Sequence, residues 1–295
     1  MEESALTQTV RTAWQKSKWI IKGFVVGFIA LALLIPAWYV KGIVEERAAR
    51  QQEAANEVTR KWAGSQLFTG PLLGIPYWNT EPAPDGKSTL RAKHVAWFLP
   101  EKLSISGTID PREKTRGIYR VSLYQSDLKV NGNFLAPDFK PFNIDPGNIE
   151  WSEAFVEIGL SDLQGLNAQP LLQWNDSSME LSTVADDETA LRTLLPLTPQ
   201  QGGNFSFNLD LNGSKQLQVM PVGKLTELKL QSTWKDPSFS GNLLPQSSSV
   251  NDSGFTAYWK SLAQHRAFPR QWTDDQYHLQ QEPVPRPAGL TGATE

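Results

Sequence analysis

The sequence predicts a mainly β protein in which an N-terminal transmembrane helix continues into a juxtamembrane helix and then into an antiparallel β-sandwich-like body. Three observations predict it. An apolar run without a charge occupies positions 23–40. A proline-free segment of strong helix formers follows. From Leu67 onward, short runs of alternating apolar and polar residues are separated by turn residues, which is typical of antiparallel strands.

The apolar run has the length of a membrane span. At about 1.5 Å per residue it would extend roughly 27 Å, close to the ~30 Å hydrocarbon core of a bilayer. A cleaved signal peptide and a buried core helix are the alternatives, but a signal peptide has a shorter apolar core and a core helix is seldom apolar on every face. We therefore predict an uncleaved anchor at 19–40. Its residues are Trp19, Gly23, Phe24, Val25, Val26, Phe28, Ile29, Leu31, Leu33, Leu34, Ile35, Pro36, Trp38, Tyr39 and Val40.

The flanking segments complete the N-terminal region. Residues 1–18 precede the span, and 41–64 is predicted to continue as a helix that stops at Gly64. That helix has only a thin apolar stripe. A stalk or partner-binding helix is one interpretation, and a helix packed on its own domain is the favoured one.

The predicted β-rich body covers 65–272. Phe205, Phe207, Leu209 and Leu211 alternate with polar residues over a whole run. Further strands are expected in KHVAWFL, LSISGTI, EAFVEIGL, MELST, KQLQVMPV, LTELKLQSTW and FTAYW.

Three local features of the body are also expected. The alternation in GIYRVSLYQSDLKVNG changes phase near 125–127, which predicts a bulge. Short helices are expected at 161–164 and 187–194. Residues 273–295 are expected to be a flexible tail, with a disordered composition from Gln281.

Composition excludes several kinds of chemistry. The chain has no cysteine, so disulfides, thiolate nucleophiles and cysteine-ligated metals are excluded. Its three histidines (His94, His265 and His278) leave little material for a metal site, and the net charge of -3 argues against nucleic-acid binding. The acidic pairs at 186–187 and 274–275 are typical of solvated turns. We expect no catalytic residue, cofactor or metal, and a protein that is not an enzyme.

Eleven tryptophans invite a second hypothesis, because sugars stack on exposed aromatic rings. Five of them lie within or beside predicted strands, where aromatic side chains commonly pack a sheet face. Packing is therefore the favoured interpretation for Trp97, Trp151, Trp174, Trp234 and Trp259.

Basic residues near the span leave its orientation nearly balanced. Four precede it: Arg11, Lys16, Lys18 and Lys22. Four follow it: Lys41, Arg47, Arg50 and Arg60. Because the preceding lysines lie closer to the run, the pattern leans weakly towards a cytoplasmic N-terminus.

Several blocks occur in a distinctive order and spacing. They are GPLLGIPY (70–77), KHVAWFLPEKLSISG (93–107), GIYRVSLYQSDLKVNGNF (117–134), EIGLSDLQGL (157–166), LTELKLQSTWKDPSFSGNLLP (225–245) and SGFTAYW (253–259). Together they resemble the inner membrane protein CreD family over about Val25 to Trp272. Their number, rather than any single block, makes the resemblance specific.

The resemblance implies a single-pass protein of the bacterial inner (cytoplasmic) membrane, with a cytoplasmic N-terminus and a β-rich periplasmic body. It also implies a non-enzymatic role in cell envelope integrity or envelope stress. The expected partners are the lipid bilayer and other envelope proteins. A membrane-anchored module that binds a glycan or peptide, and a periplasmic hydrolase, are the alternatives.

Family members are expected to continue into a C-terminal block of several membrane helices. After Val40 this sequence has no second run that could span a bilayer. A truncated product, a frameshifted reading and a short relative are the alternatives that the resemblance leaves open.

Overall fold

The computed structural model describes residues 3–82, 88–185, 187–273, 277 and 288–292. Side chains are described from position 22 onward, apart from position 23 and the strand at 288–292. The chain divides into two compact units, Met1–Asn56 and Glu57–Glu295, and each is described by itself below.

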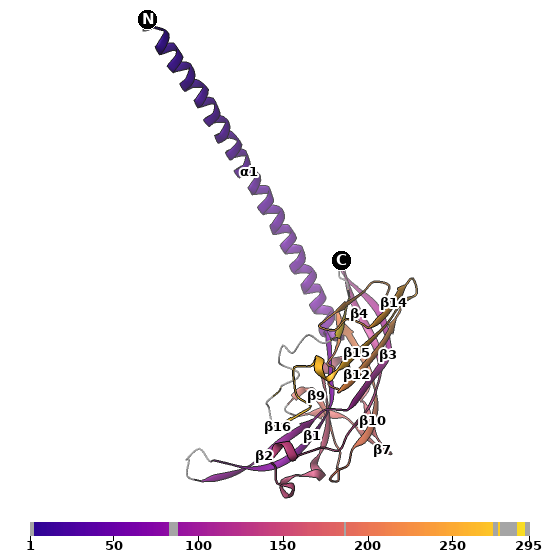
Figure 1. Ribbon diagram of the computed structural model, residues 1–295. Coiled ribbons are helices and arrows are strands. Elements are labelled where there is room, and N and C mark those ends of the chain that lie inside the picture. Colours follow the sequence, from indigo (N-terminus) through magenta and orange to yellow (C-terminus); the bar gives the residue numbers. More distant parts are fainter. Residues whose placement is uncertain (1–2, 83–87, 186, 274–276, 278–287, 293–295) are drawn as a thin grey trace. The chain divides into compact units, whose positions relative to one another are not determined.

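One long helix, α1 (Glu3–Trp62), contains both the apolar run and the segment of helix formers (Figure 1). It continues through Pro36 and ends two residues before Gly64. The prediction of an apolar helix that continues directly into a second, polar helical segment is confirmed.

The second unit is a β-sandwich of two sheets, drawn in Figure 1. In the described residues, the nine-stranded sheet has the order β13 (Pro237–Ser240), β17 (Ala288–Gly292), β11 (Gln216–Val219), β1 (Gln66–Pro82), β5 (Phe155–Leu160), β9 (Asp187–Leu194) and β8 (Ser182–Val184). The strand β2 (Thr89–Phe98) pairs with β1, and β16 (Gln271–Thr273) pairs with β2. The eight-stranded sheet has the order β14 (Ser247–Asn251), β15 (Gly254–Leu262), β12 (Leu225–Ser232), β3 (Lys102–Arg116), β4 (Tyr119–Phe134), β10 (Gly203–Ser214), β6 (Leu171–Trp174) and β7 (Ser177–Glu180).

Short 3₁₀ turns lie in the connections. They are η1 (Lys140–Phe142), η2 (Pro146–Asn148), η3 (Trp151–Glu153), η4 (Leu163–Gly165) and η5 (Ala263–His265). The turn η4 overlaps the short helix expected at 161–164.

The body is mainly β, as predicted, but its sheets are mixed rather than wholly antiparallel. Among the described strands, two pairs are parallel: β1 with β11, and β3 with β12. Long stretches of chain separate the partners in both pairs, as parallel pairing requires. Alternation along a strand reports which face is buried and carries no information on the direction of its neighbour, so the sequence could not have indicated these two pairs.

The hydrophobic core lies between the two sheets. The ring of Phe68 on β1 meets that of Phe207 on β10 edge-on, with centroids 6.3 Å apart. Phe239 on β13 packs on Trp259 of β15 at 5.5 Å. The hydroxyl of Tyr124 on β4 also crosses the interface and donates to the carbonyl of Gln216 at 2.9 Å. Inward-facing side chains of both sheets therefore form one core.

The bulge expected near 125–127 is absent from the described strand β4. Its register with β3 and with β10 continues without a shift through these residues. The change of phase has another cause: Leu128 and Val130 face the core, whereas Val121 and Leu123 are buried outside the core cluster, on the opposite face. The strand thus buries its core-facing side from Tyr124 onward and, at Val121 and Leu123, its other side as well.

The helix expected at 187–194 is wrong, because these residues form β9. The strand pairs with β5 on one side and β8 on the other, and Leu191 lies opposite Ile158. Glu188, Ala190 and Leu191 have good helix propensity, but pairing in the sheet overrides a preference that is weak over so short a segment.

The predicted flexible tail also differs from the structure in part. Residues 288–292 form β17, which pairs with both β11 and β13. Tyr277 packs its ring on Trp272 at 5.8 Å. The rest of the segment 274–295 lies outside the described residues.

Candidate functional site

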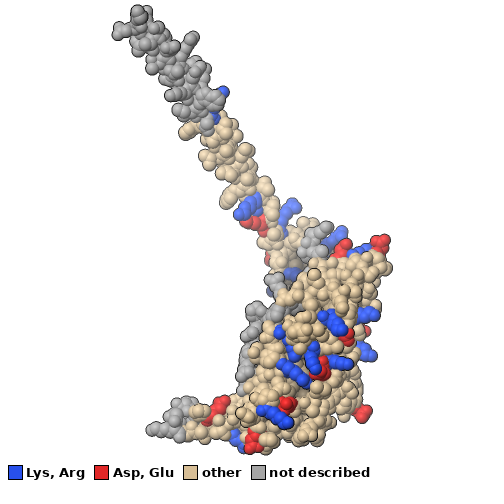
Figure 2. Space-filling model, in the orientation of Figure 1, with Lys and Arg blue, Asp and Glu red and all other residues tan. Residues whose placement is uncertain are grey.

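The apolar stretch of α1 is exposed along its described length. A stretch of the helix reaches a mean hydropathy of 2.0 with none of it buried, so by length and composition the helix could cross a membrane. Phe24, Phe28 and Ile35 are between 70% and 80% exposed. Figure 2 shows this stretch as a part of the helix without charged side chains. A helix that is apolar on all faces is normally buried, in a protein core or in a membrane. The fold of the first unit does not bury it.

The structure places the predicted anchor residues on this one helix. Trp38 and Tyr39 are 78% and 67% exposed, near its boundary with the first charged turn. Trp19 and Gly23 have helical backbone, and their exposure lies outside the described residues.

The end of α1 is bound to the β3–β4 hairpin. The Arg116 guanidinium donates to both carboxylate oxygens of Glu57, at 3.0 and 2.8 Å. The indole nitrogen of Trp62 donates to the Tyr124 carbonyl at 3.4 Å, and the Lys114 ammonium lies 5.1 Å from the Trp62 ring centre. These contacts fix the last turns of the helix on the outer face of the hairpin.

Arg116 also changes the chemistry of Glu57. Its hydrogen bonds and charge hold the pKa of the Glu57 carboxyl below the ordinary value. The carboxylate is therefore charged, and bonded to Arg116, throughout the neutral pH range.

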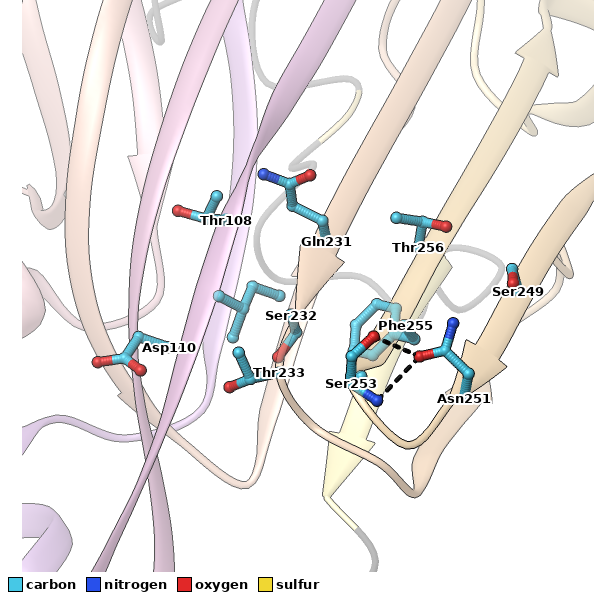
Figure 3. Close-up of a pocket in the computed structure, with 12 residues that line it drawn as sticks. Thr108, Asp110, Gln231, Ser232, Thr233, Ser249, Asn251, Ser253, Phe255 and Thr256 are labelled. Atoms are coloured by element: carbon cyan, nitrogen blue, oxygen red, sulfur yellow. Dashed lines mark hydrogen bonds between the residues drawn. The ribbon is translucent and has the colours of Figure 1, made fainter.

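A first hollow in the body, of about 380 Å³, lies where β12 ends at Ser232 (Figure 3). Its neighbour β3 continues beyond that point, so a gap is left between β3 and the β14–β15 turn. Asn251 stabilises that turn by accepting from the backbone nitrogen and the hydroxyl of Ser253, at 2.9 and 2.5 Å. Asp110 lies on the opposite side of the hollow from Asn251 in Figure 3. Hydroxyl and amide groups line the hollow together with Asp110 and the apolar side chains of Ile109 and Phe255, and no acid–base pair is brought together there.

A second hollow, of about 880 Å³, lies on the outer face of the eight-stranded sheet. Five amide side chains line it, and we call it the amide hollow. They are Asn131, Asn133, Gln173, Asn175 and Asn204. This site was not predicted from the sequence, because its residues come from several strands. A usable signal was Asn131–Gly132–Asn133, which places two amides on one face of a strand.

The two described histidines have separate surroundings. His94 on β2 contacts Glu81 through Nε2 at 3.1 Å and stacks on Tyr77 with ring centres 5.5 Å apart. His265 accepts from the backbone nitrogen of Leu262 at 3.3 Å and thereby closes η5. His278 lies outside the described residues. Neither hollow is lined by a histidine.

The tryptophans of the body pack as predicted. Trp174 and Trp259 are 3% and 2% exposed, and Trp97, Trp151 and Trp234 are partly buried against the core. Over the described part of the body, no row of exposed tryptophans is present for sugar stacking.

A metal site is also not indicated. In the described ranges, the structure brings no three His, Asp or Glu side chains into an arrangement that could hold a metal ion.

An unburied apolar helix that continues into a β-sandwich defines a membrane protein with a folded extramembrane body. The comparisons with known proteins name the family. The profile of "Inner membrane protein CreD" matches residues 18–285, and the chain belongs to this family.

A curated relative extends this finding. The chain is 28% identical to the inner membrane protein CreD of Escherichia coli K12 over 238 residues, which is 78% of this chain and 52% of the relative. The chain thus spans about half the length of the relative that it matches.

The solved structures that match are too dissimilar to support a conclusion about the fold or function of this chain. An M1 zinc metallopeptidase mutant from Deinococcus radiodurans is 10% identical and covers 65% of this chain and 41% of its own. The TM-score is 0.27, and a second structure, of the same mutant with a bound peptide substrate, gives 0.26.

Proposed function

We propose that this chain is a non-enzymatic protein of the bacterial inner membrane, anchored by its N-terminal helix, whose body lies in the periplasm and contributes to cell envelope integrity. The observation that carries the proposal is the exposed apolar stretch 24–40, continuous in sequence with a folded β-sandwich. The bilayer is the partner that would cover that stretch, because transfer of apolar side chains from water to hydrocarbon is favourable.

Two observations support the orientation and the non-enzymatic role. The basic residues before the span lie closer to it than those after it, which favours a cytoplasmic N-terminus. In the described residues, neither hollow of the body is lined by a histidine. Family membership supports a role in the cell envelope, since the matching profile and the relative are both described as inner membrane proteins.

A complementation experiment tests the proposal. Deletion of the gene should change the sensitivity of the strain to detergent, β-lactams or colicins, in either direction. The wild-type chain should restore the original sensitivity. A Leu31→Lys/Leu34→Lys variant should fail, because each charge at the centre of a span costs about 2.5–3.5 kcal/mol. Val44→Lys is the matched control, since it adds a charge to the same helix beyond the apolar run.

Two results would count against the proposal. One is a deletion strain with unchanged sensitivity to all three agents. The other is full restoration by the doubly charged variant, which would show that the function does not need the anchor.

A further inference from the structure

The floor of the amide hollow is a regular array on three central strands. Asn133 on β4 lies opposite Asn204 on β10, and Asn131 lies opposite Ser206. On the other side of β4, Asn131 lies opposite Ser104 of β3. Directly opposed residues point to the same face with Cβ atoms about 4.5–5.5 Å apart, so these groups form a close-set polar surface.

The polar groups of this array are available to a ligand. The side chains of Asn131, Asn133 and Asn204 make no hydrogen bond to another residue in the part of the chain that the structure describes. Each amide offers two N–H donors and a carbonyl acceptor. A ligand that both donates and accepts hydrogen bonds at close intervals would match them.

The charges at the hollow are few and of both signs. Lys102, Asp176 and Glu227 line it together. Glu227 already accepts a hydrogen bond from the Tyr258 hydroxyl at 2.5 Å, which raises the pKa of that hydroxyl. Figure 2 likewise shows basic and acidic side chains interspersed over the visible face of the body. Charges of mixed sign give the hollow no strong electrostatic potential of one sign that would attract a highly charged polymer. An uncharged polar ligand is therefore favoured.

The hollow does not have the features of a peptide groove. Peptides commonly add to a free strand edge or insert side chains into apolar pockets. Here the strands β3, β4 and β10 are each paired on both sides. Most of the lining is amide, hydroxyl and charged side chains, and its volume of about 880 Å³ lies in the range of small-ligand sites.

We propose that the amide hollow binds a neutral, hydroxyl-rich oligosaccharide, with Asn131, Asn133 and Asn204 as the principal hydrogen-bonding residues. Sugar hydroxyls donate and accept in the same manner as the amides. The site needs no tryptophan platform, in contrast to the sequence-based hypothesis of a glycan module. The inference rests on the proposed function only for the compartment in which the sugar would be met.

Calorimetry on the full chain in detergent micelles or nanodiscs tests the proposal. The probes are the neutral tetramers cellotetraose and chitotetraose, with polygalacturonate and polyglutamate as anionic controls. Asn131→Ala/Asn133→Ala should weaken binding of the preferred neutral tetramer by about tenfold or more, because both truncated side chains lose their hydrogen bonds to the sugar hydroxyls.

Two matched variants locate the effect. Asn208→Ala removes an amide from β10 outside the hollow, and Gln231→Ala removes one from the first hollow; both should bind like the wild type. Thermal melting of all variants should agree, since none of the truncated amides makes a hydrogen bond to another described residue.

Three outcomes would overturn the proposal. They are absence of binding by both neutral tetramers at millimolar concentration, stronger binding by an anionic control, and equal binding by the double variant. None of these binding results determines the outcome of the complementation experiment, so the two proposals can fail separately.

Discussion

Glu57, Trp62 and Arg116 hold the end of α1, and their contributions should be unequal. The Glu57–Arg116 pair is exposed at the surface, where ion pairs contribute little to stability. Trp62 is half-buried and lies on the face of the hairpin that carries Lys114, which is opposite Val121 in the register. The indole therefore excludes water from residues that the main core does not reach.

This difference gives a first prediction. Trp62→Ala should lower the free energy of unfolding of the body by about 2 kcal/mol, roughly half the cost of truncating a fully buried tryptophan. Arg116→Gln, the matched control, should change it little. Chemical denaturation followed by tryptophan fluorescence measures both, and a larger loss for Arg116→Gln would show that charge, rather than packing, holds the helix end.

Glu157 is a buried carboxyl on β5 that meets Arg192 of β9. The Arg192 Nε and Nη2 atoms donate to Glu157 Oε2 at 2.8 and 2.5 Å, and the guanidinium lies 4.0 Å from the centre of the Phe155 ring. Burial raises the pKa of the Glu157 carboxyl and outweighs the opposing effect of Arg192. The folded state therefore holds this proton more tightly than the unfolded state does.

A second prediction follows for the dependence of stability on pH. With a raised folded pKa, the contribution of Glu157 is fully present below its unfolded pKa and is lost as pH rises through the folded pKa. Glu157→Gln, which keeps an acceptor for Arg192, should show a smaller loss of stability between pH 4 and pH 7 than the wild type. Urea denaturation at both pH values tests this, and an equal or larger loss in the variant would contradict it.

At the scale of whole elements, alternation was informative where one face of a strand is solvated. It found β10 over nearly its full length, and also β3, β12 and β15. It did not find β1 as a strand, because residues 68–77 of β1 are buried almost continuously and show no period of two. In β4 the same rule predicted a bulge, since burial of the second face near one end of a strand gives the same sequence pattern as a bulge.

The candidate sites divide in a similar way. The anchor could be predicted because its signal is continuous in sequence. The amide hollow could be predicted only in part. The sequence places Asn131 and Asn133 on one face of a strand, but Asn204 becomes their neighbour only through the β4–β10 pairing, and no local pattern specifies that partner.

The strand β17 gives a third prediction, which differs from the flexible tail expected from sequence. It supplies ladder hydrogen bonds to β11 and β13 at once, so its loss would expose an edge on each. Removal of residues 288–295 should lower the melting temperature by several degrees. Removal of 293–295 alone is the control, since it keeps β17. Equal melting of all three chains would show that β17 contributes nothing to stability.

At the scale of the whole molecule, one chain combines two parts that are suited to different environments. The stretch 24–40 is suited to lipid, and the sandwich buries its own apolar faces between two sheets. Because the sandwich has its own core, we expect the anchor to set where the body is held, and the body to supply the contacts with other envelope components.

The side of the membrane on which the body lies is the central claim, and cysteine labelling tests it most directly. The chain has no cysteine, so one introduced thiol reports one position. Ser248→Cys, on the exposed strand β14, should react with a membrane-impermeant maleimide in intact spheroplasts. Ser4→Cys should react only after lysis. Labelling of Ser4→Cys in intact spheroplasts, with Ser248→Cys protected until lysis, would contradict the account and place the body in the cytoplasm.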